Sequence, residues 1–292
     1  MKLISSAEPI LETGILFVVL LAAFFHATWN AVVKSSGDHL VSIAGLQLAC
    51  GIIAACLIPF VEFPEKESWP YLFASALLHS AYYIALSEAY RSGDFSQAYP
   101  VARGTAPIIV ALWGVFFLNE VLTTSGMVAL AGVITGIMIF ATRRLGQVMK
   151  DKRAMLSALI TSVFIAAYTL VDGIGGRLSG GVSGYVVWLA VFDMIPILIY
   201  TFAVRSMGVI VPIVKDWKRN LAGAVMAFGS YWIVVWAMSQ ASIPLVSALR
   251  ETSIIIAALI GAFYFKEPSG KRRIVASIII CCAIVLLAIE NH

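Results

Sequence analysis

The chain has little charge. Asp, Glu, Lys and Arg together make up 12% of its 292 residues, whereas a soluble globular protein contains about 25%. Hydrophobic residues reach 61%, and the mean hydropathy is +0.94. This composition excludes a soluble enzyme, a nucleic-acid-binding protein and a disordered segment. The excess apolar side chains can be accommodated only in lipid, so we expect the bilayer itself to be a partner of the chain.

The chain also lacks the motifs of metal, nucleotide and covalent chemistry. Its four cysteines lie inside apolar runs without CxxC spacing, which argues against a disulfide framework or a zinc site. No GxxxxGK[ST] loop is present, so ATP-driven transport by this polypeptide is not expected. Without an HExxH, HxxxxD or GxSxG motif, an intramembrane enzyme is a remote alternative, as is an accessory subunit. We expect no cofactor and no metal.

What the chain does contain is a series of long apolar runs. A membrane-spanning helix needs about 20 mostly apolar residues, and backbone groups in lipid must be satisfied within the segment. The sequence therefore predicts an all-α polytopic membrane protein with ten transmembrane helices. The predicted spans are about 13–33, 40–61, 69–90, 96–118, 124–142, 153–174, 182–204, 220–239, 242–265 and 272–289. The connections are too short for a separate domain outside the membrane.

The spans form two similar sets of five. In the fourth and ninth spans an offset of 147 residues pairs Arg103 with Arg250, and it continues through the glycine, aromatic and glutamate positions that follow. Other spans repeat at offsets of 141 to 149, which pair Tyr82 with Tyr231. A five-helix unit ends on the side opposite to its start, so its second copy is inverted. We predict two inverted five-helix repeats, residues 1–147 and 148–292.

Each fourth helix of the repeats ends in a similar motif, GVFFLNE over Gly114–Glu120 and GAFYFKE over Gly261–Glu267. With ten spans in an inverted repeat, this motif resembles the EamA family of the drug/metabolite transporter superfamily, over essentially the whole chain. The resemblance implies a bacterial inner-membrane transporter. Similar members export amino acids and related metabolites, while relatives carry sugar phosphates, nucleotide sugars or cofactors. Many members have cytoplasmic termini.

The positive charges of the loops predict the opposite orientation. Fifteen Lys and Arg residues fall in loops on one side, and three, Lys2, Lys66 and Arg177, fall on the other. Cytoplasmic loops carry the excess of Lys and Arg. Both termini are therefore predicted to be periplasmic, and the remaining two basic residues, Arg103 and Arg250, lie inside spans.

Those two arginines are the first candidates for substrate contact, because ionisable residues inside a membrane are costly. At equivalent places in the repeats, Arg103 and Arg250 can hold a carboxylate or phosphonate. The alternative is a structural role, with Arg250 held by Glu251 or by carbonyls near Pro244, and Arg103 held by Glu88 or backbone.

Three further ionisable residues are candidates for a coupling proton: His26, His79 and Asp193. For the histidines, a neutral imidazole bonded to a neighbouring helix is equally compatible with the sequence. Asp193 lies three residues before Pro196, so it can instead cap a helix break at that proline. Asp172 and Asn30 lie near the ends of spans and are interpreted as interfacial.

Aromatic side chains gather in the same spans and can line a cavity around the substrate. These residues are Trp29, Tyr82, Tyr99, Tyr231 and Trp232, with His79 among them. The alternative for them is an interfacial aromatic belt. Pro100, Gly104 and Pro107 are expected to interrupt the fourth span, whereas Pro244 is expected to open the ninth.

We therefore expect a secondary or facilitative transporter that exports a small metabolite, an amino acid, by alternating access. Its cavity is predicted between the first, third, fourth, sixth, eighth and ninth spans. An importer or exchanger of a phosphorylated or phosphonate compound is the alternative within the same class. The sequence leaves monomer and homodimer both open.

Overall fold

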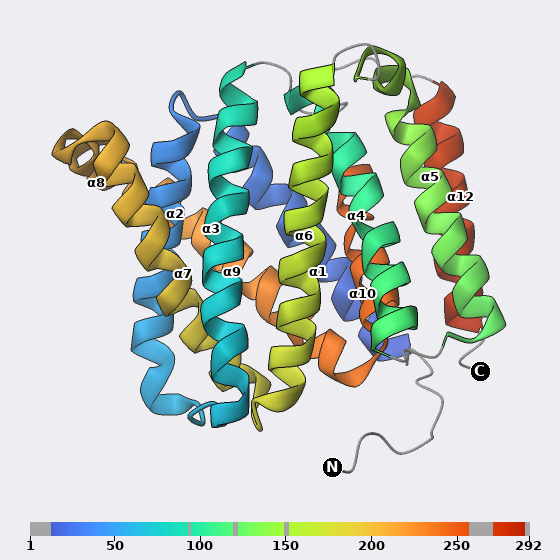
Figure 1. Cartoon of the computed structure of the whole chain (residues 1–292), viewed down its shortest axis with the longest axis horizontal. Helices are drawn as coiled ribbons and strands as arrows, with labels where there is room; N and C mark the ends of the chain where they lie inside the picture. Colours follow the sequence, from blue (N-terminus) through green and yellow to red (C-terminus); the bar gives the residue numbers. More distant parts are fainter. Residues whose placement is uncertain (1–12, 93–94, 119–121, 149–151, 257–270, 290–292) are drawn as a thin grey trace.

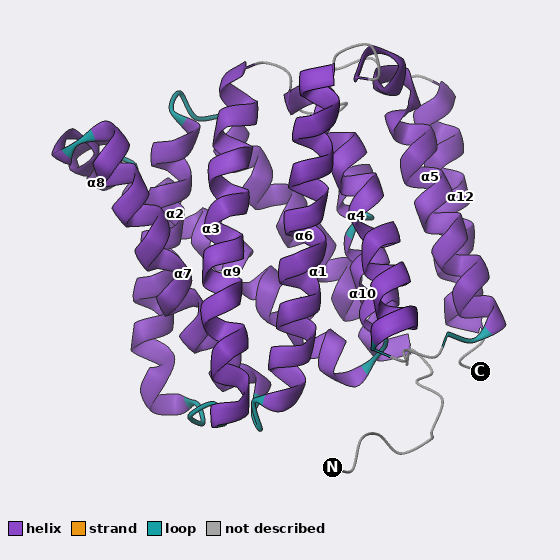
Figure 2. Ribbon diagram, viewed as in Figure 1, coloured by secondary structure: helices purple, strands orange, loops and turns teal. Residues whose placement is uncertain are grey.

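A computed structural model describes residues 13–92, 95–118, 122–148, 152–256 and 271–289 of the chain. All regular secondary structure in these ranges is helical, and they contain no strand (Figure 2). Helices are what such sequences must form in lipid, because a helix satisfies its backbone hydrogen bonds within the segment.

The helices run in chain order through the whole described structure. They are α1 (Thr13–Lys34), α2 (His39–Leu57), α3 (Trp69–Ser92), α4 (Phe95–Phe117), α5 (Thr124–Val148), α6 (Lys152–Leu178), α7 (Val182–Arg205), α8 (Ile210–Lys215), α9 (Trp217–Gln240), α10 (Ile243–Arg250) and α12 (Lys271–Ile289). Three 3-10 helices, Ile58–Phe60, Lys66–Ser68 and Met207–Val209, lie in connections.

These helices agree with the predicted spans except at the ninth. Nine spans coincide with one helix each, and their ends differ by six residues at most. The ninth span begins as α10, ends that helix at Arg250 and turns at Glu251 and Thr252. Its second half, which includes Glu267, lies outside the described residues, as does Glu120 of the first motif.

Five of the described helical segments are long and apolar enough to cross a membrane, the first at Gly14–Val33. Many large apolar side chains of the helices are exposed, including Phe17, Leu77 and Phe116. A soluble protein rarely exposes so large an apolar surface. The chain is thus an all-α, multi-pass membrane protein.

The helices pack in pairs that a relation between the two halves would produce. Helix α1 packs on α9, the eighth predicted span, and α3 packs on α6. Exchanging each span for its repeat partner turns the first of these contacts into the second. Helices α2 and α7 pack on each other at one edge of the molecule, and α5 and α12 at the opposite edge (Figure 1). The division at residue 147 stays a prediction.

Glycine spacing explains the close approach of α5 and α12. A Cβ added at Gly132 would lie 2.9 Å from that of Ala283, and one added at Gly136 would meet Ile280. A small-xxx-small spacing permits such packing in membranes. Helices α1 and α12 have their outer ends, Thr13 and Ile289, at the same end of the molecule, while α8 lies at the other end (Figure 1).

Two of the expected helix breaks are absent. Pro100 and Pro107 lie inside α4, which runs without interruption from Phe95 to Phe117, and Gly104 also lies within it. Likewise α7 continues through Pro196. Prolines are tolerated within membrane helices because neighbouring groups satisfy the freed carbonyls. Pro244 does open α10, as expected.

Candidate substrate-binding site

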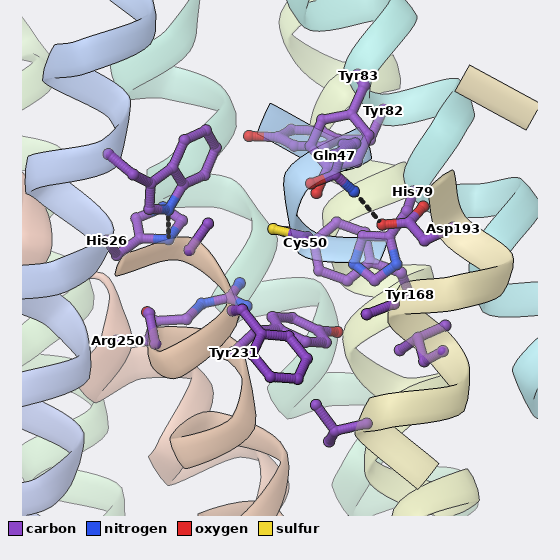
Figure 3. Close-up of a pocket in the computed structure, with 17 residues that line it drawn as sticks. His26, Gln47, Cys50, His79, Tyr82, Tyr83, Tyr168, Asp193, Tyr231 and Arg250 are labelled. Carbon is purple, nitrogen blue, oxygen red and sulfur yellow. Dashed lines mark hydrogen bonds between the residues drawn. The ribbon is translucent and has the colours of Figure 1, made fainter. Parts of the chain in front are cut away.

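A cavity of about 60 Å³ lies inside the bundle at the depth of the buried polar residues. Figure 3 shows the side chains around it. The lining comprises His26, Trp29, Gln47, Cys50, His79, Tyr82, Tyr83, Tyr168, Val186, Leu189, Ala190, Asp193, Ala227, Phe228, Ser230, Tyr231 and Arg250. Both halves of the chain therefore contribute to one enclosed polar site.

The helices that line this cavity differ from the predicted set. Helices α1, α3, α6, α9 and α10 contribute, as expected for the first, third, sixth, eighth and ninth spans. Helices α2 and α7 also contribute, which the sequence did not predict. The expected contribution of α4 is absent from the described lining, because Arg103 of α4 lies behind the wall and contacts Glu251 instead.

Glu251 brings the two buried arginines together. Its Oε2 lies 2.6 Å from Arg103 Nε, and its Oε1 lies 3.4 Å from an Nη of Arg250. Neither Arg103 nor Glu251 is exposed at all. The structural alternative is therefore correct for Arg250, while Arg103 is held by Glu251, a partner that the sequence did not suggest.

Arg103 also reaches the first helix. Its Nη2 lies 2.9 Å from Nε2 of His26, and the His26 Nδ1 accepts a hydrogen bond from the Trp29 indole at 3.3 Å. With both ring nitrogens engaged, His26 in this arrangement is a neutral imidazole that accepts from two donors only if its own proton is absent or shared. The network links α10, α4 and α1 through three side chains.

Asp172 is not interfacial, contrary to the sequence-based interpretation. It is fully buried and accepts hydrogen bonds from the hydroxyl groups of Tyr185, at 2.9 Å, and Tyr231. The His79 Nε2 lies 4.0 Å from its carboxylate, and the other ring nitrogen of His79 is 3.1 Å from the hydroxyl of Ser75. This cluster joins α3, α6, α7 and α9.

Asp193 does not cap a break at Pro196 but binds a side chain of another helix. Its Oδ2 accepts a hydrogen bond of 2.6 Å from the amide of Gln47 on α2. Its Oδ1 is buried and has no hydrogen-bond partner among the described residues. A buried polar atom without a partner is unusual and needs an explanation.

Aromatic rings connect these polar groups. His79 stacks on Tyr168 with a centroid distance of 4.2 Å and meets the Tyr231 ring edge-on at 5.1 Å. Tyr82 lies 5.6 Å from Tyr168, and the Arg250 guanidinium lies 5.8 Å from the same ring. Tyr168 is therefore the centre of the wall, although the sequence marked it only as the repeat partner of His26.

The predicted aromatic residues do not all reach the cavity. Trp29, Tyr82 and Tyr231 line it, as do the predicted His26 and His79. Trp232 packs on Phe228, 5.4 Å away, and is not part of the lining. The side chain of Tyr99 lies outside the described residues.

Several lining residues were missed for a common reason, which is that each is unremarkable in isolation. Gln47, Cys50 and Tyr83 line the cavity, yet none is charged at neutral pH. Tyr168 and Asp172 are four residues apart on one helix face, and this spacing was the available signal. No group of three His, Cys, Asp or Glu side chains in the described part of the chain could hold a metal ion.

Comparison with known proteins agrees with this architecture. The model of the EamA-like transporter family matches residues 13–142. This segment belongs to the EamA family. The family is part of the drug/metabolite transporter superfamily, whose members are membrane transporters. No curated protein matches the chain.

The family relationship extends to the fold of the complete chain. Twenty-eight chains of solved structures are similar to it. One, described only as "Crystal structure of protein", has a TM-score of 0.69 over 96% of both chains at 14% sequence identity. At that identity the likeness concerns the fold alone, and it covers both predicted repeats of this EamA protein.

Proposed function

We propose that this EamA protein exports an amino acid by alternating access, with the substrate bound in the central cavity. The observation that carries the proposal is an enclosed polar cavity between the two halves, with one arginine, Arg250, in its lining. Sites in transporters built from inverted repeats lie near the middle of the bilayer between the repeats. Small rigid-body movements of the halves would then open the cavity to either side.

Arg250 is suited to the anionic end of the substrate. It is 2% exposed, its link to Glu251 is long at 3.4 Å, and its Nε has no hydrogen-bond partner among the described residues. A carboxylate placed there would satisfy a guanidinium group that is otherwise incompletely paired. Arg103, engaged by Glu251 and His26, would act as a positioning residue behind it.

The size and pairing of the cavity favour a small substrate over a phosphorylated one. A volume of about 60 Å³ is far below the range of about 300–1,000 Å³ for drug-sized ligands. A phosphate would also draw on both arginines, yet Glu251 occupies Arg103 at 2.6 Å. The aromatic wall of Tyr82, Tyr168 and Tyr231 suits a compact amphipathic molecule.

Counterflow in proteoliposomes tests this function. Purified protein is loaded with unlabelled amino acids, and uptake of each labelled amino acid of a panel is followed with and without a pH gradient. We expect counterflow of at least one amino acid, and a dependence on the gradient would indicate proton coupling. Absence of counterflow for the entire panel would contradict the proposal.

A pair of arginine variants locates the site. Arg250→Ala should reduce counterflow at least tenfold, because the anionic end of the substrate would lose its cation. Arg205→Ala is the matched control, since Arg205 is a partly exposed arginine that pairs with Asp38 at 3.0 Å, far from the cavity lining. Full transport by Arg250→Ala would remove Arg250 from the binding site.

A further inference from the structure

The buried interior around the cavity holds more negative than positive side chains. In the described part of the chain, the buried side chains that carry a charge at neutral pH are Arg103, Arg250, Asp172, Asp193 and Glu251. Two guanidinium groups thus stand against three carboxylates. Uncompensated charge inside a membrane protein is costly and is normally paired. One cation would balance the group.

The hydrogen bonds show which carboxylate lacks compensation. Glu251 is bound by Arg103 at 2.6 Å. Asp172 accepts from the hydroxyls of Tyr185 and Tyr231. Asp193 has a single neutral donor, the Gln47 amide, and its Oδ1 is without a hydrogen-bond partner among the described residues. Asp193 is only 6% exposed and lines the cavity.

We propose that Asp193, oriented by Gln47, binds the ammonium group of the substrate. An ammonium donates up to three hydrogen bonds, so it can satisfy Oδ1 of Asp193 while adding the missing positive charge. The inference rests on the proposed function, because the ligand is the transported molecule. It narrows the substrate to compounds that carry a primary amine.

The arrangement of the cavity matches a molecule with charges at two places. Figure 3 shows Arg250 and the Gln47–Asp193 hydrogen bond on opposite sides of the site, with aromatic rings between them. Arg250 faces the cavity from α10, and Asp193 faces it from α7. A zwitterion in this position places its carboxylate near one and its ammonium near the other. A dianionic phosphate would instead bring negative charge toward Asp193.

Discrimination between an amine and a hydroxyl tests the inference. Full-length protein in liposomes takes up labelled L-alanine, L-threonine or L-leucine by counterflow, and the matching unlabelled 2-hydroxy acid competes. The hydroxy acid has a similar shape and the same carboxylate but no ammonium. We expect the amino acid to compete at least tenfold better than its hydroxy acid, because a site built around a charged group rejects the analogue that lacks it.

Variants of Asp193 and a surface control complete the experiment. Asp193→Asn should bring the competition ratio close to one, and Asp193→Glu should retain part of it. Asp38→Asn is the matched control, because Asp38 is partly exposed and pairs with Arg205 at the end of α7. If Asp193→Asn does not fold, the ratio for the wild-type protein and for Gln47→Leu still decides the question, since Gln47→Leu should lower the ratio.

The possible failures are distinct. Equal competition by amino and hydroxy acids would overturn the role of Asp193 while leaving transport intact. Unchanged discrimination in Asp193→Asn with loss of the response to a pH gradient would also overturn it, since the residue would then carry a proton. If no amino acid is taken up and none shifts the melting temperature of the protein, the inference and the proposed function both fail.

Discussion

Among single residues, Glu251 has the largest number of buried dependants. It follows α10 directly and contacts arginines of two helices, with Arg103 Nε at 2.6 Å and Arg250 at 3.4 Å. None of the three side chains is more than 2% exposed. Removing the shared carboxylate would leave two guanidinium groups facing each other without a counter-charge.

Glu251→Gln should therefore destabilise the protein strongly. Loss of one partner from a buried ion pair costs about 3–5 kcal/mol, so the melting temperature in detergent should fall well below that of the wild type. The double variant Arg103→Met, Glu251→Met should lose less than Glu251→Gln alone, because it removes a charge of each sign. A double variant that is no more stable than the single one would contradict the pairing.

Two tyrosines separate a structural from a substrate-facing role at Asp172. Tyr185 is fully buried and outside the cavity lining, whereas Tyr231 lines it, and both donate to Asp172. Each Tyr→Phe substitution should cost about 1–3 kcal/mol of stability. Only Tyr231→Phe should also raise the KM for the substrate in liposomes. A larger KM change in Tyr185→Phe would show that the assignment is reversed.

At the scale of helices, the sequence predicted positions better than contacts. Runs of about 20 apolar residues define where a helix must cross the bilayer, so nine spans were placed within a few residues. Asp172 was misplaced because its position near the end of α6 suggested an interface. Its burial depends on Tyr185 of α7 and Tyr231 of α9, which sequence periodicity does not reveal.

The partner of Arg103 illustrates the same limit. Repeat symmetry pairs Arg103 with Arg250, but the equivalent of Glu251 in the first half is Gly104. The two halves are therefore alike in their arginines and different in the carboxylate that holds them. An approximate repeat predicts matched positions, while a single unmatched residue decides the ion pairing.

The packing of α6 on its neighbours depends on a glycine pair. A Cβ at Gly175 would come within 2.6 Å of the Tyr185 ring, and one at Gly176 would lie 2.9 Å from Val235. Gly175→Ala should lower the melting temperature, because α7 would have to move away from α6 and disturb the Tyr185–Asp172 hydrogen bond. Gly208→Ala is the control, since no atom lies within 4 Å of its added Cβ. Equal stability of the two variants would contradict this packing.

At the scale of the whole molecule, the distribution of basic residues predicts an orientation that differs from the one implied by the family. Fifteen Lys and Arg residues in loops on one side place both termini in the periplasm. Alkaline phosphatase fused to the C-terminus should then be active, and a green fluorescent protein fused there should be dark. A fluorescent, phosphatase-inactive pair would reverse the orientation and favour the arrangement of other family members.

The central claim is that the cavity between the two halves binds the transported molecule, and Cys50 provides a direct probe of it. Cys50 lines the cavity, whereas Cys56, Cys281 and Cys282 are exposed on the outside of the helices. A variant with those three cysteines replaced by alanine leaves one reactive position, and a small methanethiosulfonate reagent reports its accessibility during transport.

The measurement is the rate of Cys50 modification in proteoliposomes with and without an amino acid that the protein transports. We predict that the amino acid slows modification in proportion to its occupancy, with half-maximal protection near its KM. The Arg250→Ala variant should lose this protection. Modification at the same rate at every concentration of a transported amino acid would contradict a substrate site in this cavity.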